Sequence, residues 1–153
     1  MIRPTTIPET RTAKAAVAAL LLGWICPALG ALSYSYTGAA LTIPDNNASG
    51  RAFNFSLSDP ATAITSLSIS FDISGGYNGD LYAYLSHGSG YTVLLNRTGV
   101  GQSTPGSSAS GYADSGFAIT LSSLGGANMH FYRNNSPIYN GSGQLTGMWQ
   151  PDG

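Results

Sequence analysis

The chain has 153 residues, of which 8% are charged, 42% are hydrophobic and 10% are aromatic. This length suits a single domain, and this composition excludes a charged disordered tail and a coiled coil. After residue 30 the chain holds three Arg and six Asp but neither Lys nor Glu, a net charge of −3. A nucleic-acid partner requires a dense basic patch, which three separated Arg residues do not supply.

Residues 1–30 have the pattern of a secretory signal peptide. Three basic residues in the first fourteen precede an apolar run at residues 15–26, and small residues then precede Ala31. An apolar run of about a dozen residues is too short to span a bilayer, which leaves a buried helix as the alternative. We therefore expect cleavage near Gly30/Ala31 and a secreted or cell-surface protein without a transmembrane segment. Cleavage also removes Cys26, the only cysteine, and with it any disulfide or cysteine metal site.

The remainder of the chain predicts a series of short β-strands. Apolar and polar residues alternate in four segments with the period of a half-buried strand, and a fifth segment, 91–95, is apolar on both sides toward its end. In chain order the predicted strands are residues 53–58, 66–74, 81–86, 91–95 and 117–122. Turn-forming residues separate several of them, and helical spacing is absent after residue 30. We therefore expect an all-β fold built as an antiparallel sandwich or barrel, and a sandwich is favoured because one face of each strand is polar.

Two segments do not fit a strand. Residues 99–116 are rich in Gly, Ser and Thr, and they predict a long functional or mobile loop. Residues 147–153 have a turn-like sequence, although the large ring of Trp149 requires a partner.

Several separated motifs, taken in order, resemble the P domain (P/Homo B domain) of subtilisin-like proprotein convertases. They are Ile-Pro-Asp-Asn at 43–46, Gly-Asp-Leu at 79–81, Leu-Ser-His-Gly-Ser-Gly at 85–90, Tyr-Ala-Asp-Ser-Gly-Phe at 112–117 and Gly-Met-Trp-Gln-Pro-Asp-Gly at 147–153. The sequence departs from the family pattern at His87, where the family has Pro. The resemblance covers about residues 36–153, and it implies a jelly-roll β-sandwich.

The last strands of the family pattern, with the motifs N-G-T-W-T-L and S-W-x-L, have no counterpart here. We therefore expect residues 31–153 to form a P-domain-like β-sandwich that is truncated at the C-terminus. A signal peptide directly before a lone P domain is also similar to bacterial secreted proteins that end in a PEP-CTERM sorting tail.

Catalysis is not expected from this chain. It has no G-x-S-x-G, H-E-x-x-H, C-x-x-C or G-x-x-x-x-G-K-[ST] motif, and no sequence resembling a convertase catalytic domain. Its two histidines are His87, in a predicted hairpin turn, and His130, in a predicted short strand. Ordinary surface or edge positions account for both of them.

Four aspartates are candidate calcium ligands. Asp45, Asp72, Asp80 and Asp114 occupy predicted turns or strand ends, where loops could bring hard oxygen ligands together. Some P domains carry calcium, and Asp80 is the best candidate because it occupies the Gly-Asp-Leu motif. The alternative is that each aspartate caps its own turn through a hydrogen bond.

Tyr82 and Tyr84 are candidate carbohydrate-binding residues. They share one face of the predicted strand, opposite residues 81, 83 and 85, with Tyr77 and Tyr91 near its ends. Flat rings pack on sugar faces and need no charge to do so. The alternative is a face covered by a second sheet or by the loop at 99–116.

Together these features predict a secreted, non-catalytic P-domain-like module for binding or stabilisation at the cell surface or in the extracellular matrix. Its partner would be an extracellular protein or a glycan, with calcium as its only candidate cofactor. One alternative is an accessory P domain of a subtilisin-like serine endopeptidase. The other is a carbohydrate-binding β-sandwich.

Overall fold

The computed structural model of the chain describes residues 33–36, 39–56, 58, 64–101 and 108–153. The chain divides into two compact units, residues 1–59 and 60–153. The predicted signal peptide, residues 1–30, lies outside the described part. No helix in the described part is long and apolar enough to cross a membrane.

The described residues of the first unit are held by aromatic contacts. The rings of Tyr34 and Phe55 stack with centroids 5.0 Å apart, and the edge of one ring meets the face of the other in Tyr36 and Phe53 at 4.7 Å. The strand predicted at 53–58 is wrong for its described residues, which form no strand. Their alternation gives an aromatic face, but no neighbouring strand bonds to their backbone, and a strand exists only as part of a ladder.

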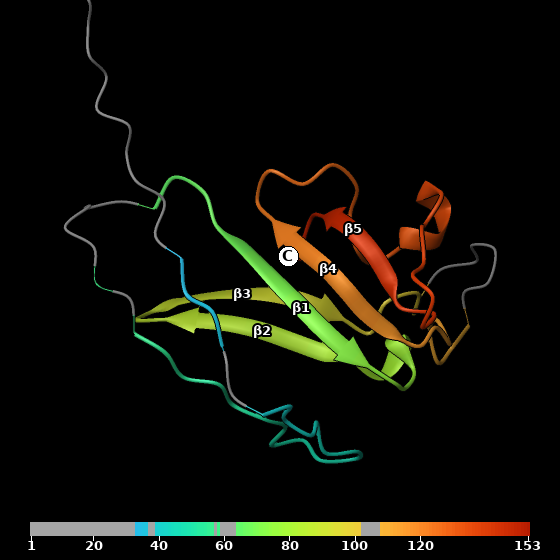
Figure 1. The fold of residues 1–153 in the computed structure, drawn as a ribbon, viewed down its shortest axis with the longest axis horizontal. Coiled ribbons are helices and arrows are strands. Elements are labelled where there is room, and N and C mark those ends of the chain that lie inside the picture. Colours follow the sequence, from blue (N-terminus) through green and yellow to red (C-terminus); the bar gives the residue numbers. More distant parts are fainter. Residues whose placement is uncertain (1–32, 37–38, 57, 59–63, 102–107) are drawn as a thin grey trace, which may run out of the picture. The chain divides into compact units, whose positions relative to one another are not determined.

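The described residues of the second unit form five strands in two sheets (Figure 1). They are β1 (Ser68–Ser74), β2 (Tyr82–His87), β3 (Gly90–Asn96), β4 (Gly116–Ser122) and β5 (Leu145–Trp149), with short 3-10 helices η1 (Asn78–Asp80) and η2 (Tyr132–Asn135). One sheet has the order β1-β4-β5, and β2 and β3 form a separate hairpin. The four strands predicted at 66–74, 81–86, 91–95 and 117–122 are confirmed, and the fold is all-β.

The expectation of antiparallel pairing is confirmed for β1–β4 and β2–β3 but is wrong for β4–β5, which pair in parallel. Parallel neighbours need a crossover long enough to return the chain to the same end of the sheet. Residues 123–144, which include η2, supply it. β5 itself occupies part of the segment expected to be a turn, so the ring of Trp149 finds its partners in the core.

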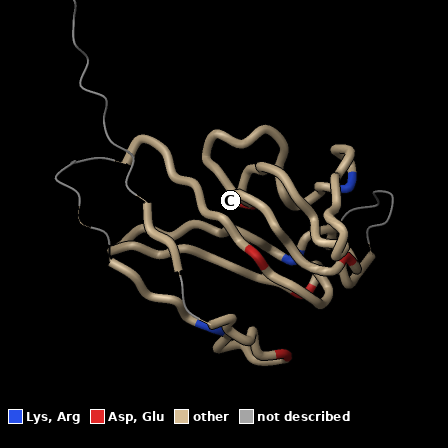
Figure 2. Tube along the Cα trace, viewed as in Figure 1, with Lys and Arg blue, Asp and Glu red and all other residues tan. Residues whose placement is uncertain are grey.

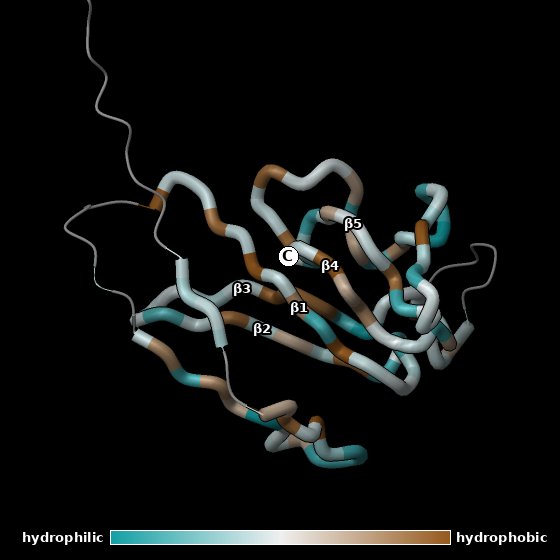
Figure 3. Tube along the Cα trace, viewed as in Figure 1, coloured by the Kyte–Doolittle hydropathy of each residue, from teal (hydrophilic) through white to brown (hydrophobic). Residues whose placement is uncertain are grey.

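Side chains from both sheets form one core. β1 alternates between half-buried apolar and exposed polar residues, as Figure 3 shows along its length. On its polar side, the hydroxyls of Ser70 and Thr120 hydrogen-bond across the ladder at 2.9 Å. The fully or nearly fully buried apolar residues are Leu94, Leu95, Tyr112, Phe117, Ile119, Leu121, Met129, Tyr132, Leu145 and Trp149. Each such side chain contributes about 1.5–3 kcal/mol relative to exposure.

A β-bulge sets which side chains of β3 face this core. Ala83 pairs with Leu95 and Tyr84 pairs with Val93, so Leu94 is an extra residue without an opposite partner. Tyr91 and Leu95 are four residues apart, and strict alternation would put them on one face. The bulge shifts the phase by one residue, so that Tyr91 is exposed while both Leu94 and Leu95 are buried.

Candidate functional site

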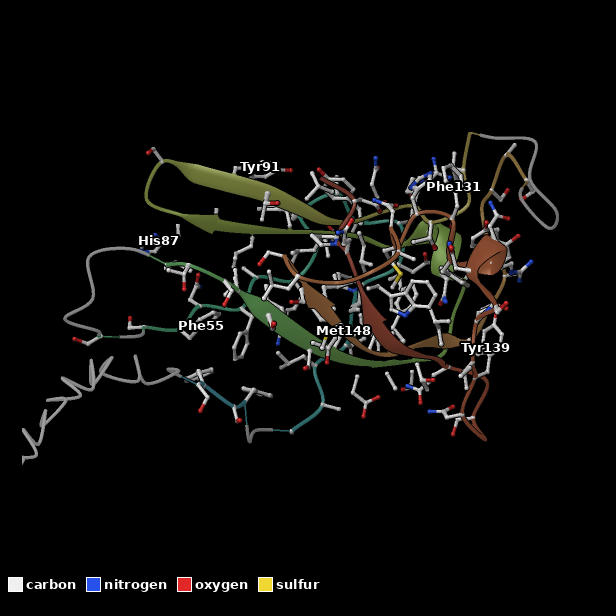
Figure 4. All side chains as sticks on the ribbon, turned by 90° about the horizontal axis from the view of Figure 1, so that it is seen from above. Phe55, His87, Tyr91, Phe131, Tyr139 and Met148 are labelled. Atoms are coloured by element: carbon white, nitrogen blue, oxygen red, sulfur yellow. The ribbon has the colours of Figure 1, made fainter. Side chains whose placement is uncertain are left out.

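The outer side of the β2–β3 hairpin carries three exposed tyrosines, Tyr82, Tyr84 and Tyr91, which we call the tyrosine face. Their exposed fractions are 51%, 58% and 59%. The ring of Tyr84 lies between the other two, with centroids 6.2 Å from Tyr82 and 5.2 Å from Tyr91. The hydroxyls of Tyr82 and Tyr91 hydrogen-bond at 2.6 Å. Figure 4 shows Tyr91 on the side of the hairpin that faces away from β1 and β4.

The strand period and the bulge together build this face. In β2 the small or apolar Ala83 and Leu85 pack against the core, which sends the tyrosines before and between them outward. In β3 the bulge sends Tyr91 to the same side. The sequence predicted that Tyr82 and Tyr84 share a face. The contact with Tyr91 depends on a bulge that no sequence pattern predicted.

The described residues leave these side chains exposed, and residues 102–107 of the loop that is the alternative cover lie outside the described part. All three rings expose about half of their surface or more. From the Gly-rich stretch at 99–116, the described residue Tyr112 turns into the core instead of covering the hairpin. Tyr77, which precedes η1, is 36% exposed and contacts none of the three rings.

Asp114 lies at the centre of a separate, partly buried hydrogen-bond network. Its Oδ1 accepts from Nη2 of Arg133 at 2.8 Å, and its Oδ2 accepts from Nε of Arg133 at 3.0 Å. Oδ2 also accepts from the hydroxyls of Tyr132 and Tyr139. The guanidinium of Arg133 lies over the ring of Tyr112, 4.6 Å from its centroid. The carboxylate thus joins the loop before β4 to η2.

These partners stabilise the charged form of Asp114. Burial by itself raises its pKa, but hydrogen bonds from Arg133 and Tyr132 and the charge of Arg133 outweigh burial, so the pKa lies below its usual range. Burial and the hydrogen bond to Asp114 raise the pKa of Tyr132, so its hydroxyl stays a donor. The hydrogen bond to Asp114 also raises the pKa of Arg133. The network is therefore a fixed ion pair with neutral tyrosine donors.

Among its described residues, the second unit does not group the candidate calcium ligands Asp72, Asp80 and Asp114. Asp72 accepts a hydrogen bond at 2.9 Å from the buried amide of Gln144, and Asp80 is exposed at the end of η1. Asp45 is exposed in a turn of the first unit. In the part of the chain that the structure describes, no three His, Cys, Asp or Glu side chains are grouped to hold a metal ion. Calcium stays a prediction of the resemblance.

The two histidines occupy different surroundings. His87 is exposed at the end of β2, in agreement with a hairpin position. The short strand predicted around His130 is wrong, because the side chain of Asn128 accepts from the backbone N–H of His130 at 2.7 Å and forms a turn. His130 Nδ1 lies 3.2 Å from Asp152, as in an Asp–His pair, but Nε2 contacts the carbonyl oxygen of Val100 at 2.8 Å. A hydrolase base would present that nitrogen to a nucleophile.

No protein-family model, curated protein or solved structure gives a significant match to this chain. The resemblance to P domains therefore rests on the motifs in the sequence.

Proposed function

We propose that the chain is a secreted, non-catalytic jelly-roll β-sandwich module of P-domain type that binds glycans through the tyrosine face. The observation that carries the proposal is the contact of three exposed tyrosine rings on the outer side of one hairpin. The motifs shared with P domains and the signal-peptide pattern support the class of module and its secretion.

The fold does not need these rings for its own core. The inner side of the hairpin supplies Ala83, Leu85, Leu94 and Leu95 to the core, whereas the tyrosines stay about half exposed or more. Tyrosine offers a large amphipathic surface with little conformational entropy to lose on binding. Exposed aromatic clusters of this kind mark interaction surfaces. A sugar ring supplies the apolar face and the hydroxyls that match them.

The test compares three proteins on an array of neutral and charged oligosaccharides: the wild type, Tyr84→Ala, and Tyr77→Ala as a matched control. Tyr84 is the central ring, so its loss removes both ring contacts of the face. Tyr77 is an exposed tyrosine outside the face. We expect the wild type and Tyr77→Ala to bind the same glycans and Tyr84→Ala to lose them, with unchanged melting temperatures.

Equal glycan binding by the wild type and Tyr84→Ala would contradict the proposal. Absence of binding to every glycan would also contradict it. The second result would favour a protein partner, as the accessory role beside a subtilisin-like serine endopeptidase requires.

A further inference from the structure

The tyrosine face is not flat. The planes of Tyr82 and Tyr84 are inclined by 48° to each other, and those of Tyr84 and Tyr91 by 34°. A planar crystalline surface can lie parallel to only one such ring at a time. A single polymer chain can instead turn from one ring to the next as it crosses the hairpin. The bulge beside Tyr84 increases the local twist of the strands that carry the rings.

The hydrogen bond between the hydroxyls of Tyr82 and Tyr91 joins the side chains of the two strands of the hairpin. It fixes two rings relative to each other before a ligand arrives, which lowers the entropy lost on binding. The hydrogen bond to Tyr82 also raises the pKa of Tyr91, so that hydroxyl remains neutral at physiological pH. Both residues stay more than half exposed and can exchange hydrogen bonds with sugar hydroxyls.

The hairpin carries no charge that could select an ionic ligand. Between Leu81 and Asn96 the sequence contains no Asp, Glu, Lys or Arg, and both strands are tan in Figure 2, the colour of residues other than these four. Apart from the imidazole of His87 at the end of β2, an anionic polymer would find no basic side chain on these strands, and a cationic one would find no carboxylate. Attraction that does not depend on charge is also insensitive to salt.

From this geometry we infer that the tyrosine face selects a single, uncharged, dissolved glycan chain over a flat crystalline polysaccharide or a charged polymer. This inference rests on the proposed glycan binding. The chain lies across the hairpin, with successive sugar units stacked on neighbouring tyrosine rings. Its hydroxyls exchange hydrogen bonds with the Tyr82–Tyr91 pair.

The experiment uses polysaccharides that share a backbone and differ in charge or state. Affinity electrophoresis measures how strongly uncharged hydroxyethylcellulose and anionic carboxymethylcellulose retard the protein. A pull-down measures its binding to microcrystalline cellulose. Neutral arabinoxylan and galactomannan, with alginate as an anionic polymer, extend the set to other backbones. We expect retardation by at least one neutral dissolved polymer, unchanged up to about 1 M salt. We expect weaker binding to its charged and crystalline counterparts.

Two variants assign the binding to the face. Tyr84→Ala should weaken retardation roughly tenfold, because the loss of one stacked ring removes about 1.4 kcal/mol of binding free energy. Tyr82→Phe keeps the ring and removes the hydroxyl pair, so it should weaken retardation by a smaller factor. Tyr77→Ala should bind like the wild type.

Several results would overturn the inference. Binding that depends on Tyr84 but prefers crystalline cellulose or the anionic polymers would leave the proposed function intact and refute the selectivity. Retardation equal in the wild type and Tyr84→Ala would refute both. A Tyr84-dependent dimer in sedimentation, with no retardation by any neutral polymer, would assign the face to a second copy of the chain instead.

Discussion

At the scale of single residues, the buried amide of Asn78 shows how a polar side chain positions several elements. Its Nδ2 donates to the carbonyl oxygen of Gly116 at 3.2 Å and to the hydroxyl of Tyr132 at 3.1 Å. Its Oδ1 accepts from the backbone N–H of Gly116 at 2.7 Å. A fully buried amide is tolerated only when its bonds are satisfied in this way. Asn78 therefore joins η1, the start of β4 and η2.

Backbone contact reinforces this junction at Gly79. A Cβ atom on Gly79 would lie 2.1 Å from the carbonyl oxygen of Ser110 and 2.7 Å from the Cα of Gly111. Only glycine permits the two backbones to approach so closely. Close backbone packing thus explains the glycine of the Gly-Asp-Leu motif, whether or not Asp80 binds a metal.

Replacing Asp114 by Asn should destabilise the protein by about 2 kcal/mol at neutral pH, because the substitution breaks an ion pair and weakens several hydrogen bonds. The folded-state pKa of Asp114 is lowered, so its contribution is present above the usual carboxyl pKa of about 4 and is lost as the pH falls through the lower folded value. The difference in the free energy of unfolding between the wild type and Asp114→Asn, measured by urea denaturation, should therefore become smaller in acid.

Asp80→Asn is the matched control, because Asp80 is exposed. Asp80→Asn should leave the free energy of unfolding nearly unchanged both at neutral pH and in acid. A difference between the wild type and Asp114→Asn that stays constant down to strongly acidic pH would contradict the assignment of the acid sensitivity to this carboxylate.

At the scale of elements, the bulge in the β2–β3 hairpin decides which side chains are core and which are available to a ligand. Val93, Leu94 and Leu95 form a continuous apolar run, so periodicity alone cannot assign them to faces. The structure buries Leu94 and Leu95 and leaves Val93 on the side of Tyr84. A local irregularity of one residue therefore creates both the packed side and the tyrosine face.

This assignment predicts unequal costs for truncating neighbouring apolar residues. Leu95→Ala removes a fully buried side chain and should destabilise the protein by about 2–5 kcal/mol. Val93→Ala, on the partly exposed side, should cost less than about 1.5 kcal/mol. Denaturant midpoints measured by circular dichroism provide the comparison. Equal losses of stability in the two variants would contradict the assignment of Leu95 to the core side and Val93 to the outer side.

At the scale of the second unit, the residues after β5 join the two sheets. The backbone N–H of Gly153 donates to the carbonyl oxygen of Val93 at 3.2 Å, and Asp152 Oδ2 accepts from the N–H of Asn96 at 2.6 Å. Asp152 also contacts His130. This short segment links β5 of one sheet to β3 of the other and to the turn before η2.

Calcium can be tested on the whole chain. In the described part of the chain no three His, Cys, Asp or Glu side chains are grouped, and the carboxylate of Asp114 accepts hydrogen bonds from Arg133, Tyr132 and Tyr139. The P-domain resemblance predicts a higher melting temperature in millimolar calcium than in a chelator, because a ligand that binds the folded state alone stabilises it. An unchanged melting temperature would contradict that prediction. Magnesium is the control for a nonspecific ionic effect.

The sequence by itself determined the strands β1 to β4, the all-β class and the shared outward face of Tyr82 and Tyr84, because these follow from a local period of two residues. Tertiary structure decided what depends on distant partners. Residues 53–56 alternate well but have no ladder, Leu145–Trp149 becomes a strand because β4 lies beside it, and Asp114 meets Arg133. Tyr91 joins the tyrosine face because one unpaired leucine shifts its phase. Which strands pair, and where a bulge interrupts the ladder, depend on residues far apart in the sequence, so local alternation alone does not determine them.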